Sequence, residues 1–551
     1  MLNSISGKNY KAFEEFELNI SPITVLLGAN SCGKSSIINL FLLLSQTIDS
    51  IEDLKGPLRL NGHNVGLGES INIIRNKDVN NNIEFSFDIE SKALAKMSQR
   101  ILNAPVRNFS MLIQFYEHFS TSFKNKETKE QFEILKGRLD RDDVISKNSI
   151  PEILKVVKLL KDEPNIKDIE LFNFEHDDFI DVVKELNKIS FTSFTPKYIS
   201  YSLCNNITNV HDINFTIDEI TLKNKKSQTI ISINFNKKTS KSDIISDNLL
   251  PEISESLLSS INVNSLSLRE YNGVNLEKKP RGFNFIDEIK KDINKKLSKI
   301  IESTIYLSVD ELFKSLNSEN ITHITPLRAE PRRYYLLDKT ANHKALNTMD
   351  GTSLAEVLKN TPSLVKKINN LIESFNLEIS IDPTNEIIHQ IIVHQDGLPL
   401  DITDVGFGIS QFLPIIVQSL ICPKGSIVLI EQPEIHLHPK MQTWLMDCLC
   451  EIALKEEKKI IIETHSDVMI KRLQLRMIDE DYDISREHVN IYNLERLQSK
   501  NEKIKTVMNR VEITDFSEII WPNGFLDYEI NDSIKFEELK FSLMKKASNR
   551  V

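Results

Sequence analysis

One eight-residue loop near the amino terminus constrains the fold of this chain more than any other feature. Residues 28–35 read Gly-Ala-Asn-Ser-Cys-Gly-Lys-Ser, which fits the pattern G-x-x-x-x-G-K-[ST] without a gap. The loop stands between an apolar run at 23–28, suited to a buried strand, and a helix-forming run at 35–44. Glycines let the backbone bend so that successive N–H groups point at phosphate oxygens. The segment therefore predicts a nucleotide-binding α/β fold.

The chemistry of this loop assigns roles to its side chains. We expect Lys34 to reach the β- and γ-phosphates of ATP, and Ser35 to ligate Mg²⁺. The following helix N-terminus adds a favourable dipole for the phosphates. A chance glycine-rich turn is the alternative, and it is disfavoured because motif and context agree. The residues expected to bind nucleotide here are Gly28, Asn30, Ser31, Cys32, Gly33, Lys34, Ser35 and Ser36.

The α/β pattern is interrupted in the middle of the chain. Residues 91–310 are rich in Lys, Asn, Ser and Asp, and hold long helix-like stretches with a small strand element. Apolar strands and helices return after this segment. We predict an α/β P-loop head in two parts, at 1–90 and 311–500. A large, mostly helical insertion at 91–310 splits it, and a small segment follows at 501–551.

Composition narrows the class of protein. A length of 551 residues allows several domains, and a net charge of -10 argues against coating DNA along the whole surface. The five cysteines show neither paired zinc spacing nor a disulfide framework, which fits a reducing cytosol. No apolar signal core and no run of about 18–20 apolar residues is present. We expect a cytoplasmic protein without membrane contact.

A second apolar run, at 426–430, ends in acidic residues. Glu431 follows it directly, which would place a carboxylate beside the Mg²⁺ held by Ser35. In hydrolysing sites of this kind a second acid usually polarises the attacking water. Here that position is Gln432, whose amide cannot accept a proton. Either hydrolysis is slow or Glu434 takes the base role, although Glu434 could instead cap the next turn.

Two histidines, His436 and His438, follow at once and with Glu434 present metal-binding side-chain types. The favoured interpretation is a loop that contacts another subunit.

Residues 401–411, DITDVGFGISQ, precede another helix. Two glycines and a serine at a helix start make a second anion site, which one chain cannot easily use on the same phosphate. We expect Gly406, Gly408 and Ser410 to complete the pocket of a second copy, in a head-to-tail homodimer or a higher even oligomer. The alternative is a glycine-rich helix start with Ser410 as its N-cap.

The last apolar strand ends in Glu463-Thr464-His465-Ser466. His465 would lie level with the γ-phosphate and could respond to its presence; the alternative is a strand-end histidine bonded to a neighbouring loop. The candidate catalytic residues are Glu431, Gln432, Glu434 and His465, and the candidate metal ligands are Ser35 and Glu431.

Basic residues gather in the insertion within residues 277–299, with four acids among them. A solvated helix face explains this pattern, and a nucleic-acid or partner surface is the alternative. Arg328, Arg332 and Arg333 could touch nucleotide, DNA or core acids, and the sequence does not choose.

Taken together, these motifs resemble the AAA-type, ABC-like ATPases related to RecF, SMC heads and the OLD proteins. The resemblance is carried by GANSCGKSS, TDVGFGISQFLPI, IVLIEQPEIHLHP and IIIETHS, and covers roughly 1–90 and 320–530. A closer likeness is to the ATPase subunits of Septu antiphage systems, including those attached to retrons. It is carried by residues 57–62, 67–69, 326–335 and 521–525.

This resemblance implies a slow ATPase that controls a separate HNH-type nuclease subunit. In this subgroup Gln432 belongs to the usual pattern. OLD-type relatives carry a Toprim nuclease domain after the ATPase, but only 86 residues follow His465. We therefore expect no nuclease domain in this chain. Two other functions stay open: a RecF-like repair ATPase that binds DNA directly, and an ATP-sensing scaffold with negligible turnover.

Overall fold

The structure is a computed structural model, and it describes most of the head and parts of the middle segment. The described residues are 1–51, 54–92, 94–96, 123–139, 150–161, 163–164, 194–209, 212–244, 261–269, 293–336, 352–384, 388–405, 407–497, 505–521 and 527–548.

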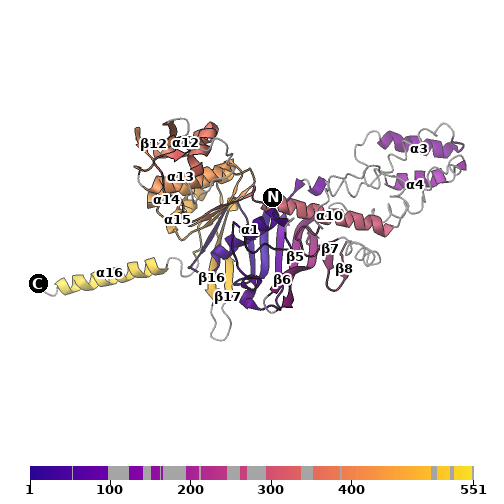
Figure 1. Cartoon of the computed structure of the whole chain (residues 1–551), viewed down its shortest axis with the longest axis horizontal. Helices are drawn as coiled ribbons and strands as arrows, with labels where there is room; N and C mark the ends of the chain where they lie inside the picture. The colour runs from indigo at the N-terminus through magenta and orange to yellow at the C-terminus, as the bar shows by residue number, and fades with distance from the viewer. Residues whose placement is uncertain are drawn as a thin grey trace.

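One long mixed sheet organises the described residues (Figure 1). Its strands are β1 (Leu2–Tyr10), β2 (Phe13–Asn19), β3 (Ile23–Gly28), β4 (Ile83–Ile89), β5 (Pro196–Asn209), β6 (Asp212–Asn224), β7 (Thr229–Asn234), β8 (Thr239–Lys241), β9 (Ile321–Ile324), β14 (Ile427–Glu431), β15 (Lys459–Glu463), β16 (Val489–Leu497) and β17 (Lys505–Arg510). They lie in the order β8-β7-β6-β5-β4-β1-β2-β17-β16-β3-β15-β14-β9.

The strands from β16 to β9 form a parallel block within this sheet. β3 lies between β16 and β15, β14 lies next to β15, and β9 lies next to β14. The carboxyl ends of parallel strands meet at one edge of a sheet, which is where α/β folds bind ligands. The register pairs Glu431 with Glu463 at that edge. The fold thus brings the phosphate loop and two strand-end acids to one place.

Helices cover both faces of the parallel block. On one face α1 (Lys34–Asp49) packs with Leu26, and on the other α13 (Phe407–Ile421), α14 (Pro439–Lys455) and α15 (Asp467–Ile478) pack with Val25 and Leu27. All six residues of β3 are buried, which explains its uninterrupted apolar sequence.

The other described α-helices are α3 (Lys126–Leu139), α4 (Ile150–Lys161), α10 (Ile293–Leu316), α11 (Thr352–Asn360), α12 (Pro362–Ile372) and α16 (Asp527–Ser548). The short 3₁₀ turns are η2 (Ser70–Ile73), η3 (Arg75–Lys77), η6 (Glu373–Phe375) and η7 (Arg486–His488).

A second, smaller antiparallel sheet precedes α13. Its strands are β10 (Tyr335–Leu336), β11 (Leu377–Pro383), β12 (Ile388–Gln395) and β13 (Leu398–Asp401). The glycine-rich segment predicted to contact a second copy connects β13 to α13.

The expected fold class is confirmed: an α/β P-loop head with a long segment inserted between its two parts. The strand content of that segment is larger than the small element expected. β5 and β6 span 14 and 13 residues and extend the main sheet beyond β4. The expected boundary after residue 310 falls inside α10, which packs against α1. The strands that extend the sheet were hard to predict because only one face of each strand is buried, which leaves about half of its side chains polar.

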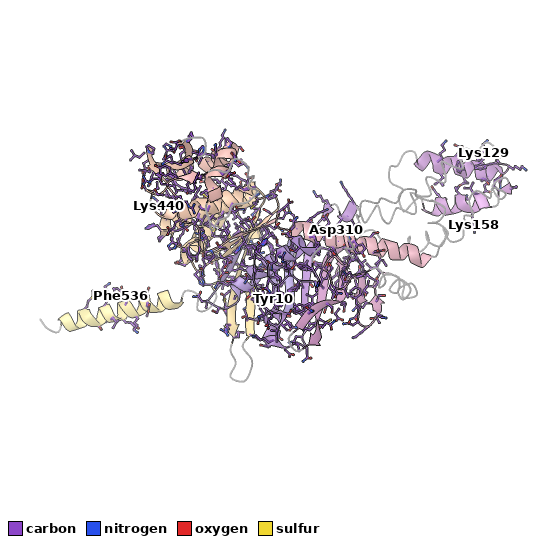
Figure 2. All side chains as sticks on the ribbon, in the orientation of Figure 1. Tyr10, Lys129, Lys158, Asp310, Lys440 and Phe536 are labelled. Atoms are coloured by element: carbon purple, nitrogen blue, oxygen red, sulfur yellow. The ribbon has the colours of Figure 1, made fainter. Side chains whose placement is uncertain are left out.

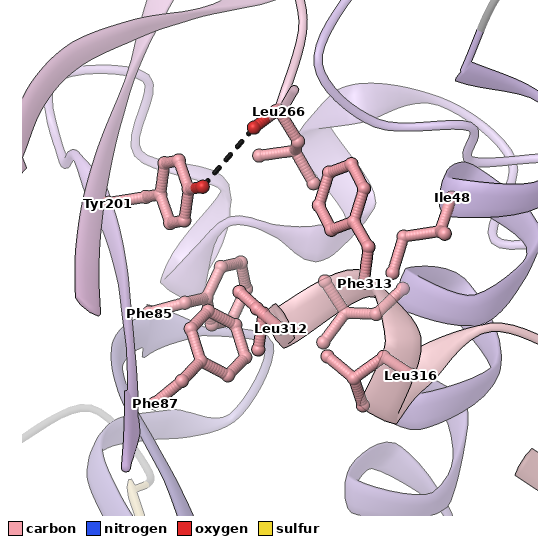
Figure 3. Close-up of a pocket in the computed structure, with 9 residues that line it drawn as sticks. Ile48, Phe85, Phe87, Tyr201, Leu266, Leu312, Phe313 and Leu316 are labelled. Atoms are coloured by element: carbon pink, nitrogen blue, oxygen red, sulfur yellow. Dashed lines mark hydrogen bonds between the residues drawn. The ribbon is translucent and has the colours of Figure 1, made fainter. Parts of the chain in front are cut away.

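Figure 3 shows a small apolar cavity where the head and the inserted segment meet. Tyr201, the polar side chain of its lining, donates a hydrogen bond from Oη to the carbonyl of Leu266 at 3.2 Å. The lining comes from α1, β4, β5, α10 and the segment 261–269, so the inserted strands and the head share one hydrophobic core. The lining residues are Leu44, Ile48, Phe85, Phe87, Tyr201, Leu266, Leu312, Phe313 and Leu316.

The carboxy-terminal helix α16 projects away from the sheet, and Figure 2 shows Phe536 on it. Several of its large apolar side chains are exposed, namely Ile534, Phe536, Leu539, Phe541 and Met544. Among the described residues, no helix combines the length and apolar character needed to cross a membrane.

Candidate functional site

The phosphate loop connects β3 to α1 and depends on its glycines. Gly28 has φ 137° and Gly33 has φ 105°, conformations that strain other residues. Space is also lacking: a Cβ at Gly28 would lie 2.3 Å from the carbonyl oxygen of Leu494, and one at Gly33 would lie 2.9 Å from Phe13. Both glycines are therefore required by the loop's own geometry.

Lys34 and Ser35 begin α1 directly after the loop. The Lys34 side chain is 3% exposed, and its Nζ donates to the carbonyls of Gly28 and Ala29 at 2.9 Å each. The same Nζ lies 4.0 Å from a carboxylate oxygen of Glu463. Ser35 Oγ donates to the Glu463 carboxylate at 3.1 Å. The lysine and serine predicted to bind phosphate and metal thus converge on one buried acid.

The remaining loop residues divide into an outer and an inner set. Asn30 and Ser31 are exposed, so they can meet a ligand from solution. Cys32 points inward and is 1% exposed, and burial raises the pKa of its thiol. The carbonyl of Ser36 accepts a hydrogen bond from Tyr10 Oη at 3.2 Å, which anchors α1 to the sheet.

Glu463 and Glu431 end neighbouring strands. Glu463 is 4% exposed, and burial together with the charge of Glu431 raises the pKa of its carboxyl, although Lys34 and Ser35 oppose the shift. Glu431 Oε1 lies 2.7 Å from His323 Nε2 on β9. Glu463 and His323 were absent from the predicted site. The strand-end rule that found Glu431 applies equally to Glu463, whereas His323 carries no local signal.

The donor set at this edge suits Mg²⁺. Ser35, Glu431 and Glu463 offer one hydroxyl and two carboxylates, and Mg²⁺ prefers oxygen ligands. The alternative of a metal held by Glu434 and the two following histidines is not supported. His438 caps α14 instead, with Nδ1 accepting from the Lys440 N–H at 3.2 Å. In the described part of the chain, no group of three His, Cys, Asp or Glu side chains could hold a metal ion.

Gln432 follows Glu431 in an unusual backbone conformation. Its φ is 44°, in the left-handed region that non-glycine residues seldom adopt. Two hydrogen bonds hold it: its N–H donates to the carbonyl of Glu463 at 2.7 Å, and its carbonyl accepts from Arg328 Nη2 at 3.1 Å. A strained backbone conformation of this kind persists where several surrounding contacts hold the residue in place, and such residues are often found at functional sites.

Glu434 is turned toward the end of β15. Its two carboxylate oxygens accept from Thr464 Oγ1 and from the backbone N–H of His465, each at 2.8 Å. Of the two roles that the sequence left open, this arrangement favours holding a turn over acting as a free base. The turn that it holds is the one that carries His465.

His465 itself is exposed at the edge of the site. Partial burial of the ring and the nearby charge of Lys34 lower its pKa, against the opposing effect of Glu434. The lowered pKa favours the neutral imidazole, which can donate one hydrogen bond and accept another.

The glycine-rich segment before α13 differs in part from expectation. Gly406 lies outside the described residues. α13 begins at Phe407, so Ser410 stands inside the first turn, where it is 3% exposed and is not the N-cap. Gly408 packs closely against the start of α14, because a Cβ there would lie 2.4 Å from Met441 Sδ. A contact of this segment with a second copy stays a prediction.

The sequence of this chain is similar to those of known proteins. A family model described as "AAA ATPase domain" matches residues 1–470. The OLD nuclease of Thermus scotoductus is 30% identical over 109 residues, which are 18% of this chain and 21% of that protein. The chain therefore matches about a fifth of that relative's length.

Solved structures give weak likenesses. The SMC head domain from Thermotoga maritima has a TM-score of 0.33 at 8% identity, covering 93% of this chain and 99% of that one. An SMC head bound to the C-terminal winged-helix domain of ScpA has a TM-score of 0.33 at 9% identity, covering 92% and 98%. The fold assignment rests on the strand order itself.

Proposed function

The chain belongs to the AAA ATPase domain family, and from this premise we propose that it binds ATP with Mg²⁺ at its phosphate loop and hydrolyses the ATP slowly. One observation carries the proposal. Lys34 and Ser35 meet Glu463 at the carboxyl ends of the parallel strands, with Glu431 in register beside it. A buried ammonium, a hydroxyl and two carboxylates at the end of a phosphate loop are the groups that Mg²⁺–ATP requires.

In the proposed complex each side chain has a distinct task. Lys34 exchanges its two loop carbonyls for oxygens of the β- and γ-phosphates, where its charge acts in a site screened from water. Ser35, Glu431 and Glu463 would hold Mg²⁺, which neutralises charge on the phosphates. His323 orients Glu431 through the 2.7 Å contact between Nε2 and Oε1.

Slow hydrolysis follows from the groups near the attacking water. Gln432 can orient water through its amide carbonyl but cannot take a proton. Glu434 could accept one, but both of its oxygens already accept hydrogen bonds. Phosphoryl transfer is largely dissociative, so positioning alone supports some turnover. We expect a rate well below the median of about 10 s⁻¹ for enzymes.

The ATP-binding test compares two lysine variants. Lys34→Ala should abolish binding of a fluorescent ATP analogue, because the loop then lacks the ammonium that bridges the β- and γ-phosphates. Lys8→Ala is the control, since Lys8 lies on β1 with 57% of its side chain exposed. If Lys34→Ala binds the analogue as tightly as the wild type, the phosphate-loop assignment is wrong.

We further propose that two copies associate head to tail around ATP, each completing the other's site with its residues 401–411. The support is the glycine-rich helix start at Gly408 and the resemblance described above. Thr403 is exposed in this segment, so Thr403→Arg should block the contact at the cost of one hydrogen bond, which Thr403 Oγ1 donates to Asp401 Oδ1 at 2.6 Å.

Mixing two inactive variants separates this dimer from others. Lys34→Ala keeps an intact segment at 401–411, and Thr403→Arg keeps an intact phosphate loop. A mixed dimer would therefore contain one complete site, and ATP turnover should return when the two proteins are combined. If each variant is inactive and the mixture stays inactive, the composite site is refuted.

A nuclease partner is proposed on the resemblance alone. We propose that the ATP-bound dimer restrains a separate HNH-type nuclease subunit in antiphage defence. Co-expression with neighbouring genes, followed by native mass measurement, should yield a complex that contains such a nuclease. A chain that purifies alone and binds DNA directly would favour a repair ATPase instead.

A further inference from the structure

One arginine of the site is buried with most of its hydrogen-bonding capacity unused. Arg328 lies on the loop after β9 and is 7% exposed. Its Nη2 donates to the carbonyl of Gln432 at 3.1 Å. Its Nε and Nη1 are buried and make no hydrogen bond with any described residue. Buried polar groups in native proteins are nearly always hydrogen-bonded, so an exception of this kind calls for an explanation.

The charge of this guanidinium is also poorly compensated. Burial lowers the pKa of Arg328 to about 10, and the charge of Glu434 opposes this shift. Glu434, however, directs its two oxygens to Thr464 and His465. No described carboxylate pairs with Arg328 within salt-bridge distance. A buried cation without a paired anion is costly, which indicates that an anion occupies this place in the functional state.

Arg328 belongs to the same cluster as the phosphate loop. It holds the carbonyl of Gln432, whose N–H bonds the carbonyl of Glu463, and Glu463 faces Lys34 and Ser35. The charge of Glu434 acts on Arg328, and the Glu434 carboxylate accepts a hydrogen bond from the N–H of His465. The charge of Lys34 in turn lowers the pKa of His465. The guanidinium therefore stands at the strand ends where the terminal phosphate of a bound nucleotide belongs.

The loop that carries Arg328 is held in position by its neighbours. The carbonyl of Ala329 accepts from Gln411 Nε2 at 3.4 Å, and Arg333 Nη2 lies 2.6 Å from Asp404 Oδ1. These contacts tie the loop to α13 and to the segment before it. The backbone that carries Arg328 is thus held near the strand ends before any ligand arrives, and neighbouring side chains must move apart for an anion to reach its buried Nε and Nη1.

We propose that Arg328 is a further nucleotide-binding residue, whose free N–H groups bind the γ-phosphate of ATP. The proposal rests on ATP being the ligand of the phosphate loop and adds a recognition element to that site. A planar guanidinium matches the spacing of phosphate oxygens and stays charged at any physiological pH. Because ADP lacks this phosphate, Arg328 should distinguish ATP from ADP.

The experiment uses three variants of the full chain. Arg328→Met removes the charge and keeps the length, Arg328→Lys keeps a charge without the planar fork, and Arg333→Met is a control on the same loop with a half-exposed side chain. Affinities for ATP and ADP are measured by displacement of a fluorescent analogue. Thermal unfolding without nucleotide reports the cost of the buried charge.

Arg328→Met should weaken ATP binding by about 10-fold or more, as expected for losing a charge-assisted hydrogen bond, while ADP affinity changes by less than about 2-fold. Its melting temperature without nucleotide should stay the same or rise, because an unpaired buried charge has been removed. Arg328→Lys should fold and also lose preference for ATP. Arg333→Met should change neither affinity.

An unchanged ratio of ATP to ADP affinity in both Arg328 variants would overturn the inference. A lower melting temperature with that unchanged ratio would show that Arg328 only supports the backbone of Gln432. The proposed function fails in a different way: the wild-type chain would bind neither nucleotide, or Lys34→Ala would bind ATP normally.

Discussion

Replacing Glu434 by glutamine should destabilise the protein and slow ATP turnover. The carboxylate accepts two hydrogen bonds of 2.8 Å, from Thr464 Oγ1 and from the N–H of His465. Glutamine keeps one acceptor oxygen, which must face the His465 N–H, and it loses the charge. Hydrogen bonds to charged groups contribute about 1.5–3 kcal/mol and neutral ones about 0.5–1.5 kcal/mol. Because Glu434 is only half-buried, we expect a loss of about 1–2 kcal/mol.

Urea unfolding and steady-state phosphate release measure the two effects. The control is Glu451→Gln on α14, where the acid pairs with Lys455 at 2.7 Å on the surface. A surface pair of this kind contributes about 0.5 kcal/mol or less, so the control should leave both quantities nearly unchanged. Unaltered stability together with unaltered turnover in Glu434→Gln would refute the role of this carboxylate in holding the strand end.

A double-variant cycle separates positioning from base catalysis. If Glu434 acts by placing His465, then His465→Ala should slow turnover about as much as Glu434→Gln, and the two changes together should cost little more than either alone. If Glu434 takes the proton itself, the effects should instead add.

Three further substitutions test other parts of the site. Gln432→Glu should raise phosphate release if position 432 faces the attacking water, and an unchanged rate would contradict that placement. Burial and the charge of Glu431 raise the pKa of Glu463, so the ionised carboxylate destabilises the folded protein, and this stability returns as pH falls through that pKa. The Glu463→Gln variant should therefore have a melting temperature no lower than that of the wild type at pH 7 without Mg²⁺. A much lower melting temperature of the variant would contradict this. The same variant should gain less stability from Mg²⁺–ATP. Gly408→Ala should change stability by less than about 1 kcal/mol, because the atom nearest the added Cβ is Sδ at the end of the flexible Met441 side chain and alanine is the better helix former; a loss of several kcal/mol would show that Met441 cannot move aside.

The phosphate loop was predictable because its constraints are local. A buried strand, two glycines with φ above 100° and a helix start are all encoded within about a dozen consecutive residues. Glu431 was predictable by the same reasoning, since an acid at the end of an apolar strand lies at the carboxyl edge of the sheet. The α/β class followed from this loop between a strand and a helix, and the interruption of the head followed from composition and hydrophobic periodicity.

Other features depended on which strands became neighbours. Glu463 joins the site because β15 lies between β3 and β14, and His323 meets Glu431 because β9 lies next to β14. The burial of Ser410 and the packing of Gly408 on Met441 depend on where α13 begins and on α14 lying against it. Strand order and helix packing arise from contacts between distant residues, so a local pattern does not specify them.

Arg328 shows most clearly the difference between what the sequence specifies and what the tertiary structure decides. The sequence marks three arginines, Arg328, Arg332 and Arg333, within six consecutive residues, and nothing in their spacing shows which of them has a distinct role. In the folded chain Arg333 reaches the exposed Asp404, whereas Arg328 is buried against Gln432 with two nitrogen atoms unpaired. Residue type alone set their charge. Burial decided which of them holds that charge without a partner, because the free energy of a charge depends on the solvent and counter-charges that the tertiary structure places around it.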